Sequence, residues 1–528
     1  MKFIARFLYV PLAGLLVLTS CAKDETESYD KFENQALEAW MTQHRSDLVE
    51  NLQSEGLYYV DLLDAGDLAS DPINTEDIWV SFDFSGRDLS GNIILTRNAD
   101  DAVLAGSFSK YTHYVPFYRY CGSENSGLME GTWLAMRRTL TLGDTYFRNN
   151  KDRLGITSPE VTLRYGSKIR LYMPSSVVGN GVEGTGGYEG QEGYSLSSKR
   201  PFIVTMEIRD TVSNPLEREG TDVDDFCELN GGLQIYSKGD DDTPATEVPE
   251  DPEDPEHPYN ETSKRWVSAC DSIPQVYVNV RYNPAEPRDQ LSFPAPYHVG
   301  YEPYVSEASV RDIDMQIAEA LKKRFHGEGD DYQKYEGVKA LEADSVTLDG
   351  TAKIWYIGRF LDGFIFDTNI DEVKQIIYGE VRKTGSAHSY DVQNPDLITA
   401  FYYIVPHLKY GQWATLVTTS TNAYGTTGKS GGSSTSTSSN GYTSSYYDYL
   451  NYLNYSQMYY GNNGYYGGYY NDYYGYGGLG NYGYYGGYYG GYGGNYDSGE
   501  TVTTTEVYTD IPSFSPLIFQ IYIEPDGE

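Results

Sequence analysis

A single carboxylate at the end of an apolar stretch is the first candidate for chemistry in this sequence. The stretch, residues 354–369, reads IWYIGRFLDGFIFDTN, and its acid is Asp367. Alternating bulky and small residues predict a strand, the Leu-Asp-Gly at 361–363 predicts a turn, and a second short apolar run ends at the acid. The surrounding sequence is mostly acidic or polar. An apolar hairpin with a single carboxylate at its end therefore calls for a specific role.

Cysteine and histidine, which supply many metal and redox sites, form no recognisable motif here. Three cysteines follow Cys21, namely Cys121, Cys227 and Cys270, and their irregular spacing is not that of a disulfide framework. One bridge, for example between Cys227 and Cys270, stays open in an oxidising compartment. The sequence contains no CxxC or HExxH motif, and its seven histidines are scattered. We therefore expect neither a metal nor a cofactor.

The overall charge excludes some classes of partner. The chain of 528 residues has 39 basic and 76 acidic residues, which gives a formal net charge of −37. Binding to nucleic acid requires a basic surface that neutralises phosphates, so we exclude it. The same charge disfavours direct adsorption to anionic lipid. The composition favours a well-solvated extracytoplasmic protein with two or three domains.

The N-terminus has the pattern of a targeting segment. Lys2 and Arg6 precede an apolar run, residues 7–18, that is too short to span a bilayer stably. The run ends in Leu-Thr-Ser-Cys, so residues 1–20 resemble a bacterial lipoprotein signal peptide with lipidation at Cys21; an ordinary secretory signal is the alternative. The CAKDE that follows resembles the export tags of Bacteroidetes surface lipoproteins. We expect an outer-membrane lipoprotein, surface-exposed or periplasm-facing, that meets the membrane only through its lipid.

Periodicity and composition divide the rest of the chain into two units. The predicted parts are a tether and N-terminal helix (21–54, the helix over 33–54), a first unit (55–212), an acidic, proline-rich linker (213–266) and a second unit (267–528). Strands are expected at 56–63, 77–86, 92–96, 168–174, 199–210, 275–283 and 515–524, and helices at 128–139 and 310–325. A Tyr/Gly-rich insert at about 426–508 is expected to be disordered.

Without its insert, the second unit resembles an FKBP-type prolyl isomerase domain. The matching fragments are Tyr356-x-Gly358, the Asp362-Gly363 turn, Phe366-Asp367, Leu397-Ile398 with Phe401, the run 408–425 that ends in Ala423-Tyr424-Gly425, and the last strand at 511–524 with Phe519. The family has a Val-Ile pair and a tryptophan where this chain has Leu397, Ile398 and Phe401. These fragments occur in the family's order.

The resemblance implies a fold class and a site. The fold would be α+β, with two FKBP-like antiparallel half-barrel sheets, each wrapped on a short helix. The implied catalytic residues are Tyr356, Phe366, Asp367, Leu397, Ile398, Phe401, Tyr424 and Phe519. The aromatic side chains would grip a prolyl ring, the Ile398 amide and the Tyr424 hydroxyl would bind the substrate, and Asp367 would lie at the rim and orient Tyr356. The partners would be proline-containing polypeptides.

The first unit resembles the same family with more losses. Phe84 and Gly86 take the places of the family's Tyr and Gly, and Ile94-Leu95 replaces Phe-Asp. Thr132 stands at the tryptophan position with Trp133 one residue late, Gly179 replaces the loop tyrosine, and Val204 stands where a phenylalanine is expected. The apolar pattern is intact, so we expect the fold to survive and the pocket chemistry to be lost.

Two functions follow from these observations. The first is a peptidyl-prolyl isomerase or folding helper of the cell envelope, active in the second unit. The alternative is a non-catalytic surface lipoprotein that reuses the fold for protein binding or assembly. A glycan-binding surface is a third reading, but the sequence offers no clear rigid array of aromatic residues for it. Oligomeric state, and the substrate beyond proline itself, stay open.

Overall fold

The computed structural model describes both units and the ends of the insert. The described residues are 29–75, 77–125, 128–178, 200–234, 266–268, 275–279, 293–298, 305–326, 346–347, 350–408, 410–411, 413–429, 431–438 and 502–524. The predicted signal peptide, Cys21, Cys270, Gly179, most of the acidic linker and the Tyr/Gly-rich tract lie outside them. None of the helices within these ranges is long and apolar enough to cross a membrane.

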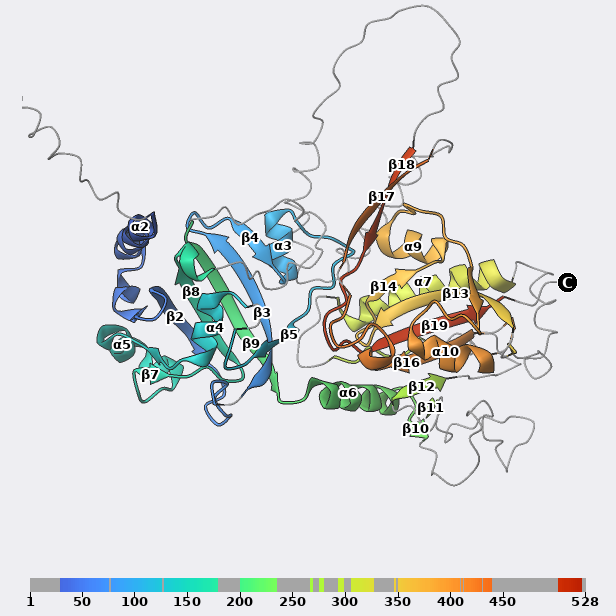
Figure 1. Cartoon of the computed structure of the whole chain (residues 1–528), viewed down its shortest axis with the longest axis horizontal. Coiled ribbons are helices and arrows are strands. Elements are labelled where there is room, and N and C mark those ends of the chain that lie inside the picture. The colour runs from blue at the N-terminus through green and yellow to red at the C-terminus, as the bar shows by residue number, and fades with distance from the viewer. Residues whose placement is uncertain are drawn as a thin grey trace, which may run out of the picture.

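The first unit is a seven-stranded sheet with helices around it (Figure 1). Its strand order is β1-β2-β8-β9-β3-β4, and β5 pairs with β3. The strands are β1 (Leu52–Gln53), β2 (Tyr58–Ala65), β3 (Ile78–Asp88), β4 (Ile93–Thr96), β5 (Phe117–Cys121), β8 (Ser167–Met173) and β9 (Phe202–Val212); β6 (Leu140–Thr141) and β7 (Glu160–Val161) form a separate pair. The helices are α2 (Tyr29–His44), α3 (Ala99–Ala105), α4 (Glu130–Arg137) and α5 (Asp144–Leu154).

The second unit is built on an eight-stranded sheet. Its order is β10-β11-β12-β16-β19-β13-β14, and β15 pairs with β13. The strands are β10 (Leu233–Gln234), β11 (Trp266–Ser268), β12 (Val276–Asn279), β13 (Thr351–Phe360), β14 (Ile365–Thr368), β15 (His388–Asp391), β16 (Trp413–Thr418) and β19 (Leu517–Ile523). The helices are α6 (Pro215–Leu229), α7 (Glu307–His326), α9 (Asp371–Tyr378) and α10 (Thr399–Ile404). The chain is thus a mixed α+β protein whose sheets are antiparallel except for the short parallel pair β10–β11.

The two units repeat one topology. The path β2-β8-β9-β3-β4 in the first corresponds strand by strand to β12-β16-β19-β13-β14 in the second, and β5 and β15 take equivalent places. The register agrees at the hairpins, because Gly86 pairs with Leu95 and Gly358 pairs with Asp367, with a bulge after each glycine. The strand pairings therefore confirm the predicted equivalence of the two hairpins, and the structure itself shows the duplication.

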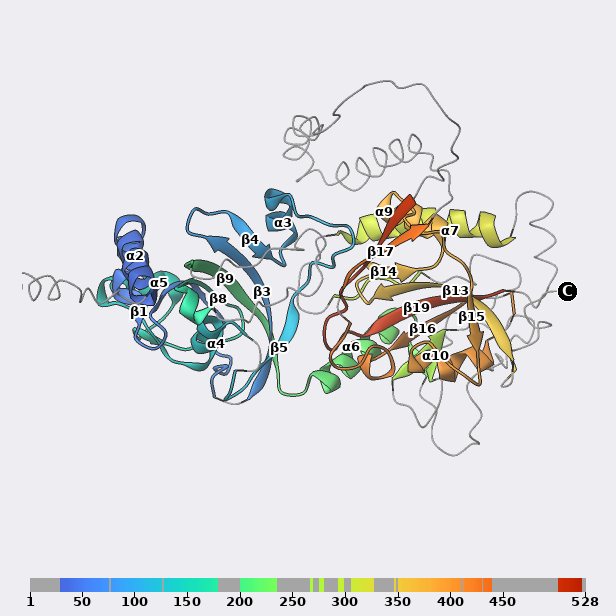
Figure 2. The same ribbon diagram turned by 45° about the horizontal axis from the view of Figure 1, so that its top comes forward.

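The sheet of the second unit is covered on both faces. One face packs on α10 and contains Phe401 and Phe519; the other packs on α7 and α9 and contains Ile317 and Trp355 (Figure 2). Successive residues of a strand point to opposite faces, which explains why β13 contributes Ile354 to the first core and Trp355 to the second. The predicted single helix against a half-barrel is therefore only one of the two layers.

Two predicted boundaries were wrong. The N-terminal helix ends at His44 rather than near residue 54, because a 3-10 helix (Ser46–Asn51) and β1 follow it. The predicted linker begins with α6. The side chain of Asn214 caps the N-terminus of this helix, and Pro215 lies in its first turn. Phe226 on this helix is fully buried against Trp266, so the helix is part of the second unit.

The insert has an ordered base where disorder was predicted from about residue 426. β17 (Gly432–Ser438) pairs antiparallel with β18 (Val502–Tyr508) over seven residue pairs. The hairpin stands out from the second unit next to α9 (Figure 1). Of the cysteines that the structure describes, Cys121 and Cys227 are buried free thiols.

Candidate functional site

Four aromatic rings from four elements meet on one face of the second unit. Phe519 on β19 is the centre, with ring centroids 5.7 Å from Phe366, 5.2 Å from Phe401 and 6.4 Å from Tyr356. Phe366 also makes an edge contact with Tyr424, at 6.4 Å between centroids. The structure thus brings the predicted aromatic residues into one cluster, with edge-to-face geometry typical of favourable aromatic pairs.

The β13–β14 hairpin sets the position of the acid. Gly358 lies beside Phe366 so closely that a Cβ on it would stand 2.6 Å from the Phe366 Cζ atom, hence only glycine fits there. A β-bulge lies immediately after this glycine, between Gly358 and Arg359. Asp367 pairs with Gly358 across the hairpin and points to the same face as the aromatic cluster, which places one carboxylate against an apolar wall.

The hydroxyl of Tyr356 donates a hydrogen bond to Asp367 Oδ2 at 2.8 Å, the contact expected from the resemblance. Burial raises the pKa of the Asp367 carboxyl above its ordinary value, against the opposing effects of the Tyr356 hydrogen bond and the Lys429 charge. Burial, reinforced by the charge of Asp367, raises the pKa of Tyr424 to about 12. Tyr424 therefore keeps its proton at neutral pH and remains a hydrogen-bond donor.

The start of α10 supplies the remaining predicted residues. Ile398 is the N-cap of the helix, in an extended conformation, and it packs with Leu397 against the same core as the aromatic cluster. Phe401 lies one turn into α10 and is 2% exposed; Phe519 is 3% exposed. These two rings therefore lie behind the surface as the floor of the cluster.

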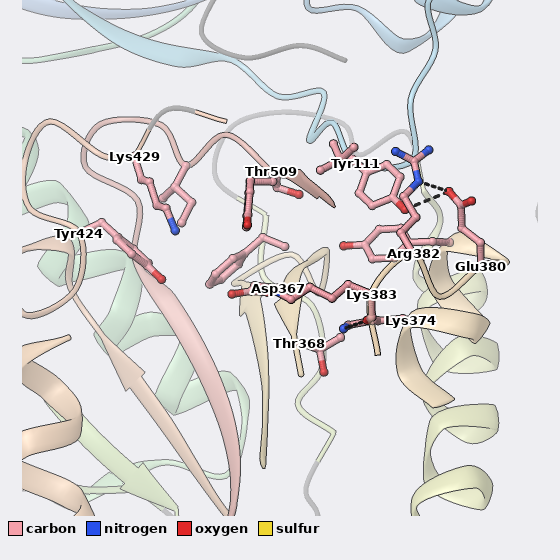
Figure 3. A pocket seen from close by; sticks show the side chains of 15 residues that line it. Tyr111, Asp367, Thr368, Lys374, Glu380, Arg382, Lys383, Tyr424, Lys429 and Thr509 are labelled. Carbon is pink, nitrogen blue, oxygen red and sulfur yellow. Dashed lines mark hydrogen bonds and ion pairs between the residues drawn. The ribbon is translucent and has the colours of Figure 1, made fainter. Parts of the chain in front are cut away.

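A cavity of about 50 Å³ opens over this cluster (Figure 3). Of the predicted site residues, only Phe366, Asp367 and Tyr424 line it. Its other walls come from the end of β14, from α9 and the segment after it, and from β18 and the residues that follow. The space suffices for a few water molecules. A peptide would therefore need the residues at the mouth to move.

Sequence reasoning missed Tyr111, which reaches this cavity from the first unit. Its ring stacks on Tyr378 with centroids 4.0 Å apart, and its hydroxyl donates to Glu380 at 3.1 Å. The Arg382 guanidinium also lies over the Tyr111 ring, 5.0 Å from its centroid. Tyr111 lies in the segment between α3 and β5, which no sequence pattern linked to the second unit.

A hydrogen bond from the segment that contains Tyr111, and an ion pair from Arg97 just before α3, hold the first unit against the second. His113 Nε2 lies 2.6 Å from Asp362 Oδ2, and both side chains are buried. The His113 ring also stacks on Phe360 and on Phe364, with centroids 4.3 and 4.6 Å away. Arg97 Nη2, fully buried, lies 2.8 Å from Asp510. The first unit is therefore docked beside the cavity by specific contacts.

The cationic lining of the cavity was also missed. Among the described residues that line it, Lys374, Arg382, Lys383 and Lys429 are basic, and Asp367 and Glu380 are acidic. Lys429 Nζ lies 5.2 Å from the Tyr424 ring centroid and 5.8 Å from that of Tyr508. Apart from the adjacent Arg382 and Lys383, these cations are far apart in a strongly acidic sequence, so no run of basic residues indicated the site.

The equivalent place in the first unit lacks this constellation. Leu95 pairs with Gly86 where Asp367 pairs with Gly358, and Val204 stands opposite Gly86 where Phe519 stands opposite Gly358. These pairings confirm the assigned positions, including the loss of both the acid and the ring. Trp133 on α4 donates through Nε1 to the Gly122 carbonyl at 3.0 Å and is buried, which is a structural role.

Comparison with known proteins gives limited likenesses. No family model and no curated protein matches the sequence. Similar solved structures include the three FKBP domains of wheat FKBP73 (TM-score 0.19, 9% identity, 89% of this chain and 95% of that one), Escherichia coli FkpA (0.21, 11%, 40% and 72%) and a peptidyl-prolyl cis-trans isomerase from Pseudomonas syringae (0.20, 16%, 36% and 99%). Likenesses at these scores carry no functional conclusion.

Proposed function

We propose that the second unit is an FKBP-like peptidyl-prolyl cis-trans isomerase, or folding helper, that acts on proline-containing polypeptides. The observation that carries this proposal is the joint contact of Phe366, Phe401 and Phe519 with the Tyr356–Asp367 hydrogen bond. Each residue alone has an ordinary structural explanation. Their convergence in one cluster directly beneath the cavity, from β13, β14, α10 and β19, is what favours a site.

The chemistry requires no nucleophile. Rotation about an X–Pro bond is opposed by a barrier of about 18–20 kcal/mol that comes from amide resonance. The uncatalysed exchange takes about 10–100 s. An apolar pocket favours the twisted amide over the more polar planar one, and a donor placed for the twisted carbonyl stabilises it. Tyr424, protonated at neutral pH, supplies such a hydroxyl.

The proposal includes a location. The lipoprotein-like signal of residues 1–20 and a lipid at Cys21 would tether the protein to the outer membrane, surface-exposed or periplasm-facing. The substrates would then be envelope or exported polypeptides.

An exchange measurement tests the activity. The full chain is added to a neutral Leu-Pro peptide, and cis-trans exchange is followed by NMR, for wild type and for Asp367→Val with Phe366→Ala. We expect acceleration that the double substitution abolishes. The matched control, Leu95→Val with Ile94→Ala, changes the equivalent positions of the first unit and should leave the rate unchanged. Tyr356→Phe keeps the packing and removes one hydroxyl, so a lower rate in this variant would not come from a loss of folding.

A non-catalytic binding module is the second candidate. The buried Phe401 and Phe519 and the small cavity, with Tyr111 at its mouth, favour it. Peptide binding without acceleration, in wild type and in Tyr111→Ala, would identify this function in place of catalysis.

A further inference from the structure

The cavity over the aromatic cluster differs from the rest of the chain in charge. Four of its lining residues are basic and two are acidic, whereas the whole chain has 39 basic and 76 acidic residues. The ratio therefore changes from about one base per two acids in the chain to two bases per acid at the cavity. Basic residues are thus enriched at the cavity although acidic residues predominate in the chain, and this points to a ligand that carries negative charge.

The two acids of the lining are already engaged. Glu380 accepts hydrogen bonds from Arg382 at 2.7 Å and from Tyr111 at 3.1 Å. Asp367 accepts the Tyr356 hydroxyl. Behind the lining, Asp371 lies 3.7 Å from Lys374, whose ammonium also donates to the Lys383 carbonyl. Lys374 is thus held within the structure, and the cation best placed for a ligand is Lys429.

Lys429 is exposed and extends over the cavity. Figure 3 shows its ammonium directed toward Tyr424 and Asp367, on the side opposite Arg382 and Glu380. Its backbone is fixed, because Lys429 and Ile511 exchange hydrogen bonds of 2.9 and 2.8 Å. A substrate whose proline approaches Phe366 would place its neighbouring side chain within reach of this ammonium.

From this arrangement we infer that the site prefers prolyl peptides with an aspartate or glutamate next to the proline. The inference rests on the proposed function, since it names the substrate class of the same site. An acidic neighbour of the proline pairs with Lys429, and a lysine at that position is repelled. At a partly solvated position such a pair corresponds to about a two- to fivefold preference, and salt weakens it.

The test uses four peptides that differ only in the residue before proline: Glu, Gln, Leu and Lys. NMR exchange rates and chemical-shift titrations are measured with the full chain, with Lys429→Glu and with a matched control. The control is Lys151→Glu, which makes the same change of net charge at an exposed position of α5 in the first unit. We expect the order Glu, Gln, Lys, lost in Lys429→Glu and at high salt, and kept in Lys151→Glu.

The outcomes separate the two proposals. Acceleration of the Leu peptide without any preference for Glu over Gln overturns the inference and keeps the isomerase. If no peptide is accelerated, the titrations decide: tighter binding of the Glu peptide that depends on Lys429 supports the charge preference in a binding module. Equal or undetectable binding of all four peptides overturns it.

Discussion

Replacing Glu219 should change how stability depends on pH. Glu219 lies on α6 and is 2% exposed; it accepts hydrogen bonds from the backbone amide and, at 2.7 Å, from the hydroxyl of Ser420, where the turn before Tyr424 begins. Burial raises the pKa of Glu219 to about 7, against the opposing hydrogen bonds from Ser420. The folded state therefore binds this proton more tightly than the unfolded chain does.

The sign and size follow from that difference. Because the pKa is about 7 when folded and near the ordinary 4.5 when unfolded, the contribution of Glu219 to stability is full below pH 4.5 and is lost as the pH rises to about 7. One pKa unit corresponds to about 1.4 kcal/mol, so the total loss is about 3 kcal/mol. Glu219→Gln cannot ionise and should show no such loss.

Urea unfolding at pH 5 and pH 8 measures the effect. The free energy of unfolding of Glu219→Gln, relative to wild type, should rise by about 3 kcal/mol between the two pH values. The relative measure largely removes the titration of Asp222, whose pKa burial raises to about 6 on the same helix. Glu217→Gln, at an exposed position of α6, controls for net charge. Parallel pH profiles of wild type and Glu219→Gln would refute the reasoning.

Two further predictions concern the cavity and the core. Tyr111→Ala removes the stack on Tyr378, which is worth about 1 kcal/mol, and so opens the mouth of the cavity. Peptide binding should therefore become about fivefold tighter in an NMR titration, and weaker binding would contradict the prediction. The control is Tyr165→Ala, at an exposed position of the first unit. Arg359→Met leaves the buried Asp314 carboxylate, 2.7 Å from the Arg359 guanidinium, without its ion-pair partner. The free energy of unfolding in urea should fall by about 3–5 kcal/mol. Adding Asp314→Leu should recover most of this loss, and a double variant as unstable as the single one would contradict it.

Local pattern was sufficient for the hairpins and their equivalence. The Tyr-x-Gly and Phe-Asp fragments predicted the hairpin of the second unit, and the weaker fragments of the first unit predicted its counterpart, with Leu95 at the position of Asp367. The strand register of the two hairpins agrees with this correspondence. Both follow from short-range alternation and from the close approach of a ring to glycine, which excludes other residues at Gly358.

The helix α6 was missed although its signals are local. Asn214 and Pro215 are ordinary start signals, and Val223, Phe226 and Cys227 recur at helical spacing and are buried. The proline and the acids around these residues have the composition of a linker, and therefore the sequence predicts a linker there. In the first unit, α2 makes a similar contact, since Glu33 accepts hydrogen bonds from the Ser175 amide and hydroxyl at 2.8 and 2.5 Å. The repeated contact shows that each unit includes the helix before it.

The mouth of the cavity could not be predicted because it is assembled from distant segments. Tyr111, the α9 region and the residues after β18 are separated by more than a hundred residues each, and no periodicity links them. Through Tyr111 the first unit lines a cavity of the second unit, and nothing in its own sequence indicates this contact. The first unit has Leu95 and Val204 where the second has Asp367 and Phe519, yet it places Tyr111 at the cavity of the second unit, where its ring stacks on Tyr378. The buried contacts of Arg97 with Asp510 and of His113 with Asp362 hold it beside that cavity, and no pattern within the first unit indicates these distant partners.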